Sequence, residues 1–294
     1  MSVASDGAAT STLESIVAVE GPWSLATSRR FWEGFAPSAL VEQAGESLRT
    51  VFLSDTDWTR IDAVITQEGG SARISVTGTG DLDVATEQVR RFMSIDIDGR
   101  GWTAVAERDP VIADAQRRLP GFRPCGFFSP YEAAVWAVLS QRIQMRQAAG
   151  IKKRLTDEHG DDGAFPTPAV LRKLELSLPG RKNEYLHAVA DAALEGALSG
   201  EHLRSLTAHE ALQNVQEIKG LGPFAAELVV IRGANFADVL PVNEKRLDTE
   251  IIEQYGTEKS VDEITAEWAP YRAWAGVHLR ALREERTGEI AGRR

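Results

Sequence analysis

The stretch 207–233 constrains the fold more than any other part of this sequence. Thr207 and Glu210 have the spacing of a capping box, which predicts a helix that begins at Thr207. The GLG run at 220–222 is too short and too rich in glycine for a regular element, so it predicts a tight turn. The first part of the stretch is therefore expected to be a helix that ends in a hairpin.

A second helix is predicted directly after the turn, over 223–232. Pro223 suits the first position of a helix, and Gly233 suits the position just past its end. The turn glycines lack a Cβ, so a phosphate can approach the main chain, and the free N–H groups of the following helix point at it. Taken alone, the hairpin is equally compatible with an ordinary turn between two helices.

The helix, the Gly-x-Gly hairpin and the second helix resemble the helix-hairpin-helix DNA-binding motif. More widely, residues 126–283 resemble the base-excision DNA glycosylases with this hairpin, in the 3-methyladenine DNA glycosylase II branch. Three runs carry the resemblance: SPYEAAVWAVLSQRI at 129–143, GLGPFAAELVVIRGANFADVLP at 220–241 and WAPYRAW at 268–274. The resemblance implies an α+β protein, in which a small antiparallel β domain precedes an all-helical glycosylase domain. Its implied partner is double-stranded DNA with a damaged base.

Local patterns divide the chain in the same way. Residues 1–12 are expected to be a disordered tail, 13–82 a β-rich domain and 83–294 the helical domain. The β-rich part contains four short runs of branched residues bounded by Gly, Asp and Ser, with a helix expected at 24–32. In the helical part, a second capping box is expected at Ser129 and Glu132, and one C-terminal helix over 262–283.

Composition restricts the class of protein. With 26% charged and 43% hydrophobic residues, the 294-residue chain is globular, and its net charge of −10 means that DNA binding requires a local basic face. The single cysteine, Cys125, excludes a disulfide framework and a four-cysteine iron–sulfur cluster. There is no apolar run of membrane-spanning length and no signal-peptide pattern. We therefore expect a cytoplasmic monomer that needs no cofactor and no membrane.

Glu244 is the candidate catalytic residue. In the family that the sequence resembles, a loop after the second helix ends in an essential aspartate, and the register from Arg232 and Asp238 places Glu244 at that position. A buried carboxylate beside the anomeric carbon stabilises the positive charge that builds on the sugar and can orient water. A shift of one residue would place Asn243 there instead, and that register predicts an inactive protein. Glu244 is preferred because Leu247 and Ile251 then follow it at +3 and +7, which is the apolar spacing of the family that the sequence resembles.

The resemblance also implies DNA contacts and a cation. The predicted DNA-binding residues are Gly220, Leu221, Gly222, Lys219, Gln141 and Arg142. Arg142 aligns with the family's wedge residue, which fills the gap left by an extruded base; the alternative is a solvated cation at a helix end. The main-chain carbonyls of Gln216, Ile218 and Leu221 are expected to hold a monovalent cation that offsets a DNA phosphate. Cations at 146 and 152–154 could add a basic face.

Four aromatic residues are candidates for a base pocket: Phe224, Tyr271, Trp274 and Trp136. Aromatic residues at helical spacing are also typical of a hydrophobic core, which is the preferred interpretation for Trp136. Bifunctional relatives carry a nucleophilic lysine where this chain has Phe224, so the resemblance implies base release without strand cleavage. The family's late pocket tryptophan is replaced by Arg280.

Two functional hypotheses follow. The first is a monofunctional DNA glycosylase that excises alkylated purines by base flipping and carboxylate-assisted cleavage of the N-glycosidic bond. The second is a non-catalytic DNA- or lesion-binding protein that kept the hairpin and lost the aspartate. A helical interaction module without a DNA role is a third alternative, which only the acidic net charge supports.

Overall fold

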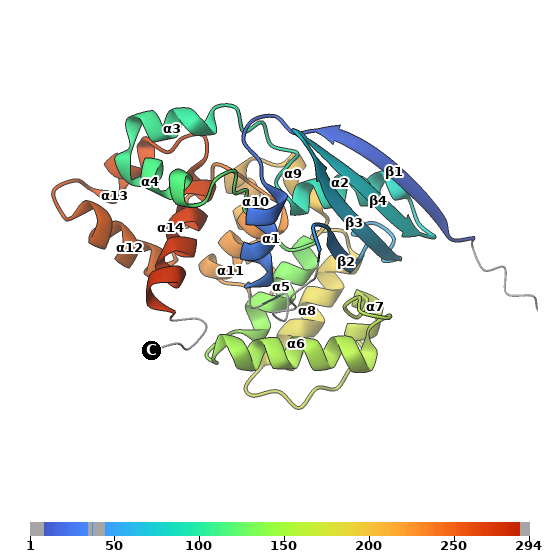
Figure 1. The fold of residues 1–294 in the computed structure, drawn as a ribbon. Coiled ribbons are helices and arrows are strands. Elements are labelled where there is room, and N and C mark those ends of the chain that lie inside the picture. Colours follow the sequence, from blue (N-terminus) through green and yellow to red (C-terminus); the bar gives the residue numbers. More distant parts are fainter. Residues whose placement is uncertain (1–8, 35–36, 38–44, 289–294) are drawn as a thin grey trace, which may run out of the picture.

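The computed structural model describes residues 9–34, 37 and 45–288. Of the tail expected at 1–12, residues 1–8 lie outside the described residues, whereas Ser11 and Thr12 belong to the first strand instead. A four-stranded antiparallel sheet comes first and helices follow, which confirms the expected α+β class (Figure 1). Among the described residues, no helix has the length and apolarity needed to cross a membrane. The elements are β1 (Ser11–Ala18), α1 (Leu25–Glu33), β2 (Leu48–Leu53), β3 (Arg60–Glu68), β4 (Ser71–Gly78), α2 (Leu82–Phe92), α3 (Trp102–Arg108), α4 (Pro110–Arg118), α5 (Pro130–Leu139), α6 (Met145–His159), α7 (Pro168–Leu171), α8 (Lys182–Leu194), α9 (Gly200–Ser205), α10 (Ala208–Gln216), α11 (Pro223–Leu228), the π-helical turn η2 (Val229–Gly233), α12 (Lys245–Tyr255), α13 (Val261–Ala266) and α14 (Arg272–Thr287).

The sheet has the strand order β1-β4-β3-β2, and every neighbouring pair is antiparallel. Alternate residues of β3 and β4 are buried, as expected for strands with one face on a core. That core includes Ile65 and Ile74 of the sheet, Trp32 of α1, and Val89 and Phe92 of α2. The packing thus groups α2 with the sheet, whereas the sequence-based boundary at residue 82 separates them.

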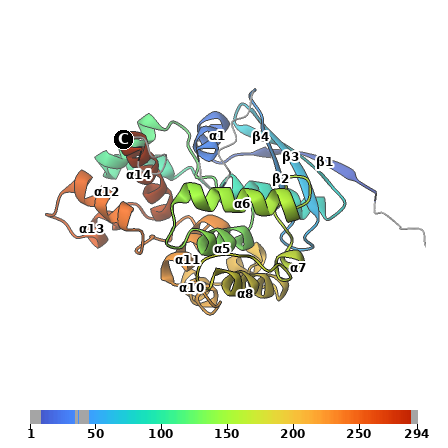
Figure 2. The same cartoon turned by 90° about the horizontal axis from the view of Figure 1, so that it is seen from below.

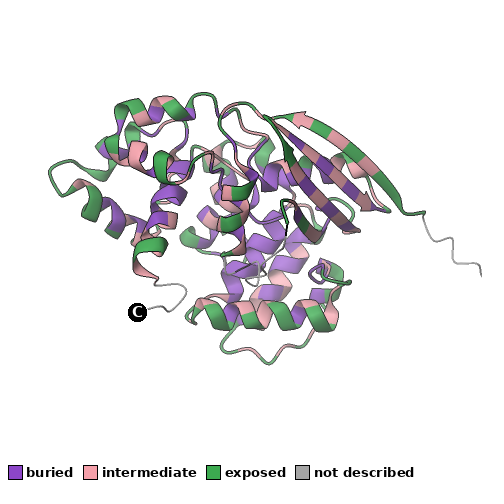
Figure 3. Cartoon of the chain, viewed as in Figure 1, coloured by how far each residue is buried: buried purple, intermediate pink, exposed green. Residues whose placement is uncertain are grey.

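Helix α5 is the centre of the helical part. All ten of its residues are buried, so the helix is purple along its length in Figure 3. A helix that is apolar all round requires neighbours on every side. Residues of α8, α10, α11 and η2 belong to the same core as α5, so the two helices of the hairpin pack with this fully buried helix.

A separate core joins the C-terminal helices to α3 and α4. Trp102 and Ile112 pack there with Leu247, Trp268 and Trp274, far away in sequence. In both Figure 1 and Figure 2, α12 and α13 stand apart from α7 and α8. The helical part therefore has two cores, and the loop from η2 to α12 runs from one to the other.

His278 of α14 is fully buried beside this second core. Its ring lies against Trp102 and Phe122, with centroids 4.9 Å and 4.7 Å away, and its Nδ1 is 2.8 Å from the Trp274 carbonyl oxygen. Burial lowers the pKa of His278 to about 4. The imidazole is therefore neutral in the folded protein at pH 7.

Arg123 ties the segments around the sheet to the helical part. Its side chain is completely buried and donates hydrogen bonds to the main-chain carbonyls of Glu20, Pro22, Ser94 and Ile97. Burial lowers the pKa of Arg123 to about 10, so the guanidinium remains charged at neutral pH. Carbonyl groups from widely separated parts of the chain thus depend on one side chain for their hydrogen bonds.

Three details differ from the sequence-based expectations. The predicted C-terminal helix is two helices, α13 and α14, because Pro270 interrupts it. Gly233 ends the π-helical turn without a positive φ; glycine is needed because a Cβ there would lie 2.8 Å from Pro130. Ser129 caps α5, but Glu132 forms an ion pair with Lys152 (3.3 Å) rather than completing a capping box.

Candidate nucleic-acid interface and active site

The hairpin between α10 and α11 forms as the sequence predicts. The capping box is complete: the Thr207 hydroxyl accepts from the Glu210 N–H, and the Glu210 carboxylate accepts from the Thr207 N–H (2.9 Å). Gly220 has φ +94°, and a Cβ there would lie 2.3 Å from the Tyr185 ring. Gly222 has open space around it, and no side chain caps α11. The start of α11 can therefore receive an anion at its main-chain N–H groups.

The hairpin contributes main-chain atoms rather than side chains at its centre. Leu221 is buried in the helical core, so only its backbone can face a ligand. Its N–H donates to the Ile218 carbonyl (3.0 Å), which leaves that oxygen one further lone pair for a cation. Gln216, the third proposed carbonyl ligand, ends α10 immediately before this turn.

A second segment lies directly beside the hairpin. The Gln141 side chain donates to the Gly220 carbonyl oxygen (2.9 Å), so the turn after α5 and the hairpin are in contact. Arg142 follows with φ +56°, a left-handed backbone that is rare outside glycine, and its side chain is exposed. Gln141 and Arg142, which come from the run 129–143, are thus adjacent to the hairpin turn that carries Gly220.

Lys219 is exposed but paired with an acid. Its ammonium contacts the carboxylate of Glu184 on α8, which also receives two hydrogen bonds from Arg181. These hydrogen bonds, from Arg181 first and Lys219 second, lower the pKa of Glu184 to about 2. A DNA phosphate would therefore compete with Glu184 for Lys219.

The other cations predicted nearby divide into two groups. Arg146 and Arg154 of α6 are exposed. Lys152 points inward to Glu132 and lies over the Phe165 ring, while Lys153 pairs with Asp157 (2.6 Å). Of the cations predicted for a basic face, Arg142, Arg146 and Arg154 are thus exposed, while Lys152 and Lys153 form ion pairs with acids.

Glu244 caps the N-terminus of α12. Its Oε1 accepts the Arg246 N–H (3.2 Å), and its side chain is 26% exposed. Arg280 of α14 approaches the same carboxylate, with its Nε 4.0 Å from Oε1. Gly276, one turn earlier, allows this approach, because a Cβ there would lie 3.1 Å from Leu247. The proposed catalytic carboxylate is thus half-enclosed between α12 and a guanidinium.

Asn243, the alternative catalytic position, is held by a residue that the sequence analysis did not single out. Its main-chain N–H and its side-chain amide both donate to the carboxylate of Glu227 on α11, at 3.0 Å and 2.6 Å. Glu227 is only 5% exposed. The sequence does contain one signal for a functional role of Glu227: it is an acidic residue inside the apolar run AAELVVI.

The four aromatic candidates are not brought together. Phe224 is 46% exposed at the start of α11. Trp136 is buried in the core around α5, whereas Tyr271 and Trp274 belong to the other core. The Tyr271 hydroxyl donates to the Asp98 carbonyl (2.6 Å), which fixes that ring in the interior. Only Phe224 presents its face to solvent.

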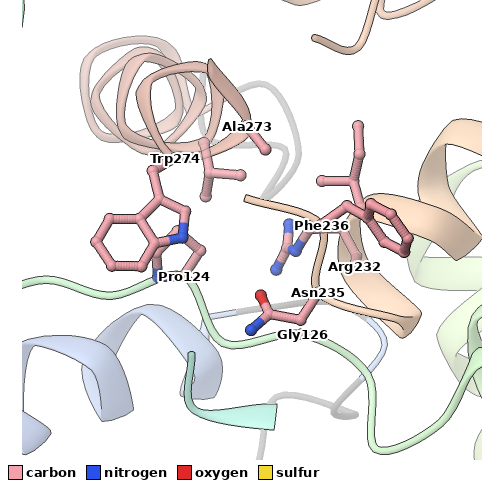
Figure 4. A pocket seen from close by; sticks show the side chains of 9 residues that line it. Pro124, Gly126, Arg232, Asn235, Phe236, Ala273 and Trp274 are labelled. Carbon is pink, nitrogen blue, oxygen red and sulfur yellow. The ribbon is translucent and has the colours of Figure 1, made fainter. Parts of the chain in front are cut away.

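A small cavity lies beside Trp274, between α14 and the segment after η2 (Figure 4). Its volume is about 10 Å³, which is room for one water rather than a purine. Trp274 Nε1 is buried and finds no hydrogen-bond partner among the described residues, and Arg232, Asn235 and Phe236 are among the other residues that line the cavity. A larger cavity, about 280 Å³, is lined by residues of α4, α12 and α14. Neither cavity is lined by Glu244.

Sequence relatives of this chain are DNA repair proteins, although no protein-family model matches it. The chain is 26% identical over 204 residues to DNA-3-methyladenine glycosylase of Bacillus subtilis, covering 63% of this chain and 67% of that one. It is 29% identical over 122 residues to DNA-3-methyladenine glycosylase 1 of Schizosaccharomyces pombe, covering 39% and 53%. The chain thus spans about half the length of the yeast relative.

Solved structures with a similar fold also include DNA glycosylases. The 3-methyladenine DNA glycosylase of Archaeoglobus fulgidus superposes with a TM-score of 0.74 at 14% identity, over 94% of this chain and 99% of that one. The Schizosaccharomyces pombe 3-methyladenine DNA glycosylase in complex with abasic DNA gives a TM-score of 0.53 at 22% identity, over 62% and 94%. At these identities the likeness shows the fold.

Proposed function

We propose that this chain, a member of the helix-hairpin-helix DNA glycosylase superfamily by its fold and its sequence relatives, is a monofunctional glycosylase that releases alkylated purines from duplex DNA. The observation that carries the proposal is the placement of Glu244. It is a partly exposed carboxylate at the end of the loop that leads from the hairpin helix to α12. A location in the cytoplasm and a monomeric state are part of the proposal, since a single cysteine suits a reducing compartment.

In the proposed reaction, the hairpin anchors the DNA. The start of α11 and the glycine turn bind a phosphate through main-chain N–H groups. A monovalent cation held by the carbonyls of Gln216, Ile218 and Leu221 would offset the charge of that phosphate. Arg142 occupies the gap that the extruded base leaves, and the exposed ring of Phe224 offers an apolar face to the flipped nucleotide.

Cleavage of the N-glycosidic bond then depends on Glu244. As the bond to the purine lengthens, positive charge develops on the sugar, and the carboxylate stabilises it and orients a water. The water adds to the anomeric carbon and gives one proton to the Glu244 carboxylate, and the alkylated purine leaves as a neutral base with the bonding electrons. Because Phe224 stands where bifunctional relatives have lysine, no Schiff base forms and the strand remains intact.

Free-base release in single-turnover reactions tests the proposal. Duplex DNA containing 7-methylguanine or 3-methyladenine is incubated with wild type, Glu244→Gln and Asp248→Asn, and the released base is quantified. Glutamine can still accept the Arg246 N–H, so Glu244→Gln should keep its fold and lose about 100-fold or more in rate. Asp248→Asn, a matched acid on the same helix, should retain activity.

The other outcomes are informative as well. Release that survives Glu244→Gln would mean that another group supplies the charge. Duplex binding without any release by wild type would favour the non-catalytic DNA-binding protein. Strand cleavage, or trapping of a covalent complex by borohydride, would contradict the monofunctional assignment.

A further inference from the structure

Glu227 is a buried acid inside the second helix of the hairpin. It lies between Ala226 and Val229, which are fully buried, and is itself 5% exposed. Within the part of the chain that the structure describes, its carboxylate accepts the main-chain N–H and the side-chain amide of Asn243, the main-chain N–H of Val242 also acts on it, and no cation forms an ion pair with it. Both carboxylate oxygens are used, Oε2 by the main-chain N–H and Oε1 by the side-chain amide.

Such a carboxylate is costly to bury without a cationic partner. Burial raises the pKa of Glu227, and the nearby charge of Glu244 raises it further, while the hydrogen bonds from Asn243 act in the opposite direction. An apolar side chain at 227 would pack into the same core without this cost. A gain in stability therefore does not explain the glutamate at 227. Its hydrogen bonds to Asn243 do.

We propose that Glu227 is a positioning residue, which clamps Asn243 and thereby fixes the carboxylate of Glu244 relative to the hairpin. This inference rests on the proposed function. Two hydrogen bonds to one residue, one of them from its main chain, define the path of the backbone immediately before Glu244. Glu227 does not touch the reacting atoms and acts through its neighbour.

The clamp connects phosphate binding to the reacting carboxylate. Glu227 lies one helical turn after Pro223, so the same short helix begins at the proposed phosphate site and holds the catalytic loop. A phosphate gripped at the hairpin would then stand at a fixed distance from Glu244. Fixed geometry matters because a misplacement of about 1 Å can cost about a hundredfold in rate.

The test separates chemistry from binding. Glu227→Gln keeps the size of the side chain but turns one acceptor into an amide donor, which faces an N–H of Asn243. The single-turnover rate of 7-methylguanine release should fall about 10- to 100-fold. The Kd for an unmodified duplex should stay within about twofold, because the glycine turn is untouched. Glu201→Gln, an exposed acid on α9, is the matched control and should match wild type in both measurements.

A double-mutant cycle asks whether Glu227 acts through Glu244. If it does, Glu227→Gln slows wild type but has little further effect in a Glu244→Gln background. Equal fold losses in both backgrounds would overturn the proposal, as would a wild-type rate in Glu227→Gln. If Glu227→Gln does not fold, Asn243→Ala serves instead, since it removes the 2.6 Å hydrogen bond from an exposed residue. Its rate should fall several-fold, and an unchanged rate would overturn the proposal. The proposed function fails separately, when wild type releases no base or Glu244→Gln has no effect.

Discussion

Gln141 donates a side-chain hydrogen bond to the Gly220 carbonyl oxygen across 2.9 Å, and this contact joins the turn after α5 to the hairpin. The two residues are widely separated in sequence and belong to different motifs. Because α5 is buried on all sides, the turn that carries Gln141 and Arg142 has a rigid base. A duplex that docks on the glycine turn would therefore meet Arg142 at a defined place.

Gly222→Asp should weaken DNA binding without unfolding the protein. A Cβ at this position meets no atom within 4 Å, so the side chain is tolerated, while its charge repels a phosphate at the start of α11. The Kd for duplex DNA, measured by fluorescence anisotropy, should rise about tenfold or more. Gly222→Ala is the comparison: it should melt like wild type, and because its Cβ stands near the approaching phosphate but carries no charge, it should weaken binding less than Gly222→Asp. Tight binding by Gly222→Asp would show that the hairpin does not contact phosphate.

Arg142→Gly should separate stability from base release. The residue has φ +56°, so glycine removes backbone strain of about 1 kcal/mol, and the melting temperature should stay equal or rise. If the guanidinium fills the gap in the base stack, release at saturating enzyme should fall about tenfold or more. Arg146→Ala, an exposed cation on α6, should weaken binding only. Wild-type release by Arg142→Gly would reject the wedge assignment.

Arg280→Ala should change substrate preference. The guanidinium lies 4.0 Å from the Glu244 carboxylate, so a positively charged alkylpurine bound near that carboxylate is repelled. After screening, this repulsion is about 1 kcal/mol, or about fivefold in rate. The ratio of 7-methylguanine release to release of a neutral base such as hypoxanthine should therefore rise in the variant. An unchanged ratio would place Arg280 away from the bound base.

His278 should make stability depend on pH. Its pKa is lowered from 6.5 to about 4 in the folded protein, so the unfolded chain binds more protons between these values and stability falls as the pH falls through this range. The loss is at most about 3 kcal/mol. Denaturant unfolding of wild type and His278→Gln from pH 7 to 5 measures it, and the variant should show the shallower slope.

The exposed histidine of α10 provides the control, since His209→Gln should keep the wild-type slope. Glu227 contributes to the pH dependence with the opposite sign, because its raised pKa means that stability is lost as the pH rises. Wild type and His278→Gln share this contribution, so it cancels when the stability curve of one is subtracted from that of the other. Identical slopes for wild type and His278→Gln would mean that the imidazole is protonated inside the fold.

Local signals in the sequence predicted the hairpin well. The capping box at Thr207 and the proline at 223 act within a few residues, so they can be recognised without knowledge of tertiary structure. Gly233 was assigned the wrong role for the same reason. Its glycine is required by the approach of Pro130, a contact between segments that no local pattern reveals.

The candidate site was predicted in part. The position of Glu244 came from a register, and the structure places it at the start of α12 with Leu247 and Ile251 buried behind it. Glu227 was missed because a glutamate in a helix is usually a solvated residue, and only the fold shows that Asn243 lies against it. The aromatic residues could not be sorted between core and pocket, since the same spacing serves both.

The buried guanidinium of Arg123 has a consequence for how the molecule comes apart. If any one of the segments it binds were lost, N–H groups of the Arg123 guanidinium would remain buried without hydrogen-bond acceptors, each at a cost of about 1–3 kcal/mol. The sheet and the helices are therefore expected to melt in one cooperative transition, and a truncation that removes the strands should not leave a folded helical remnant behind.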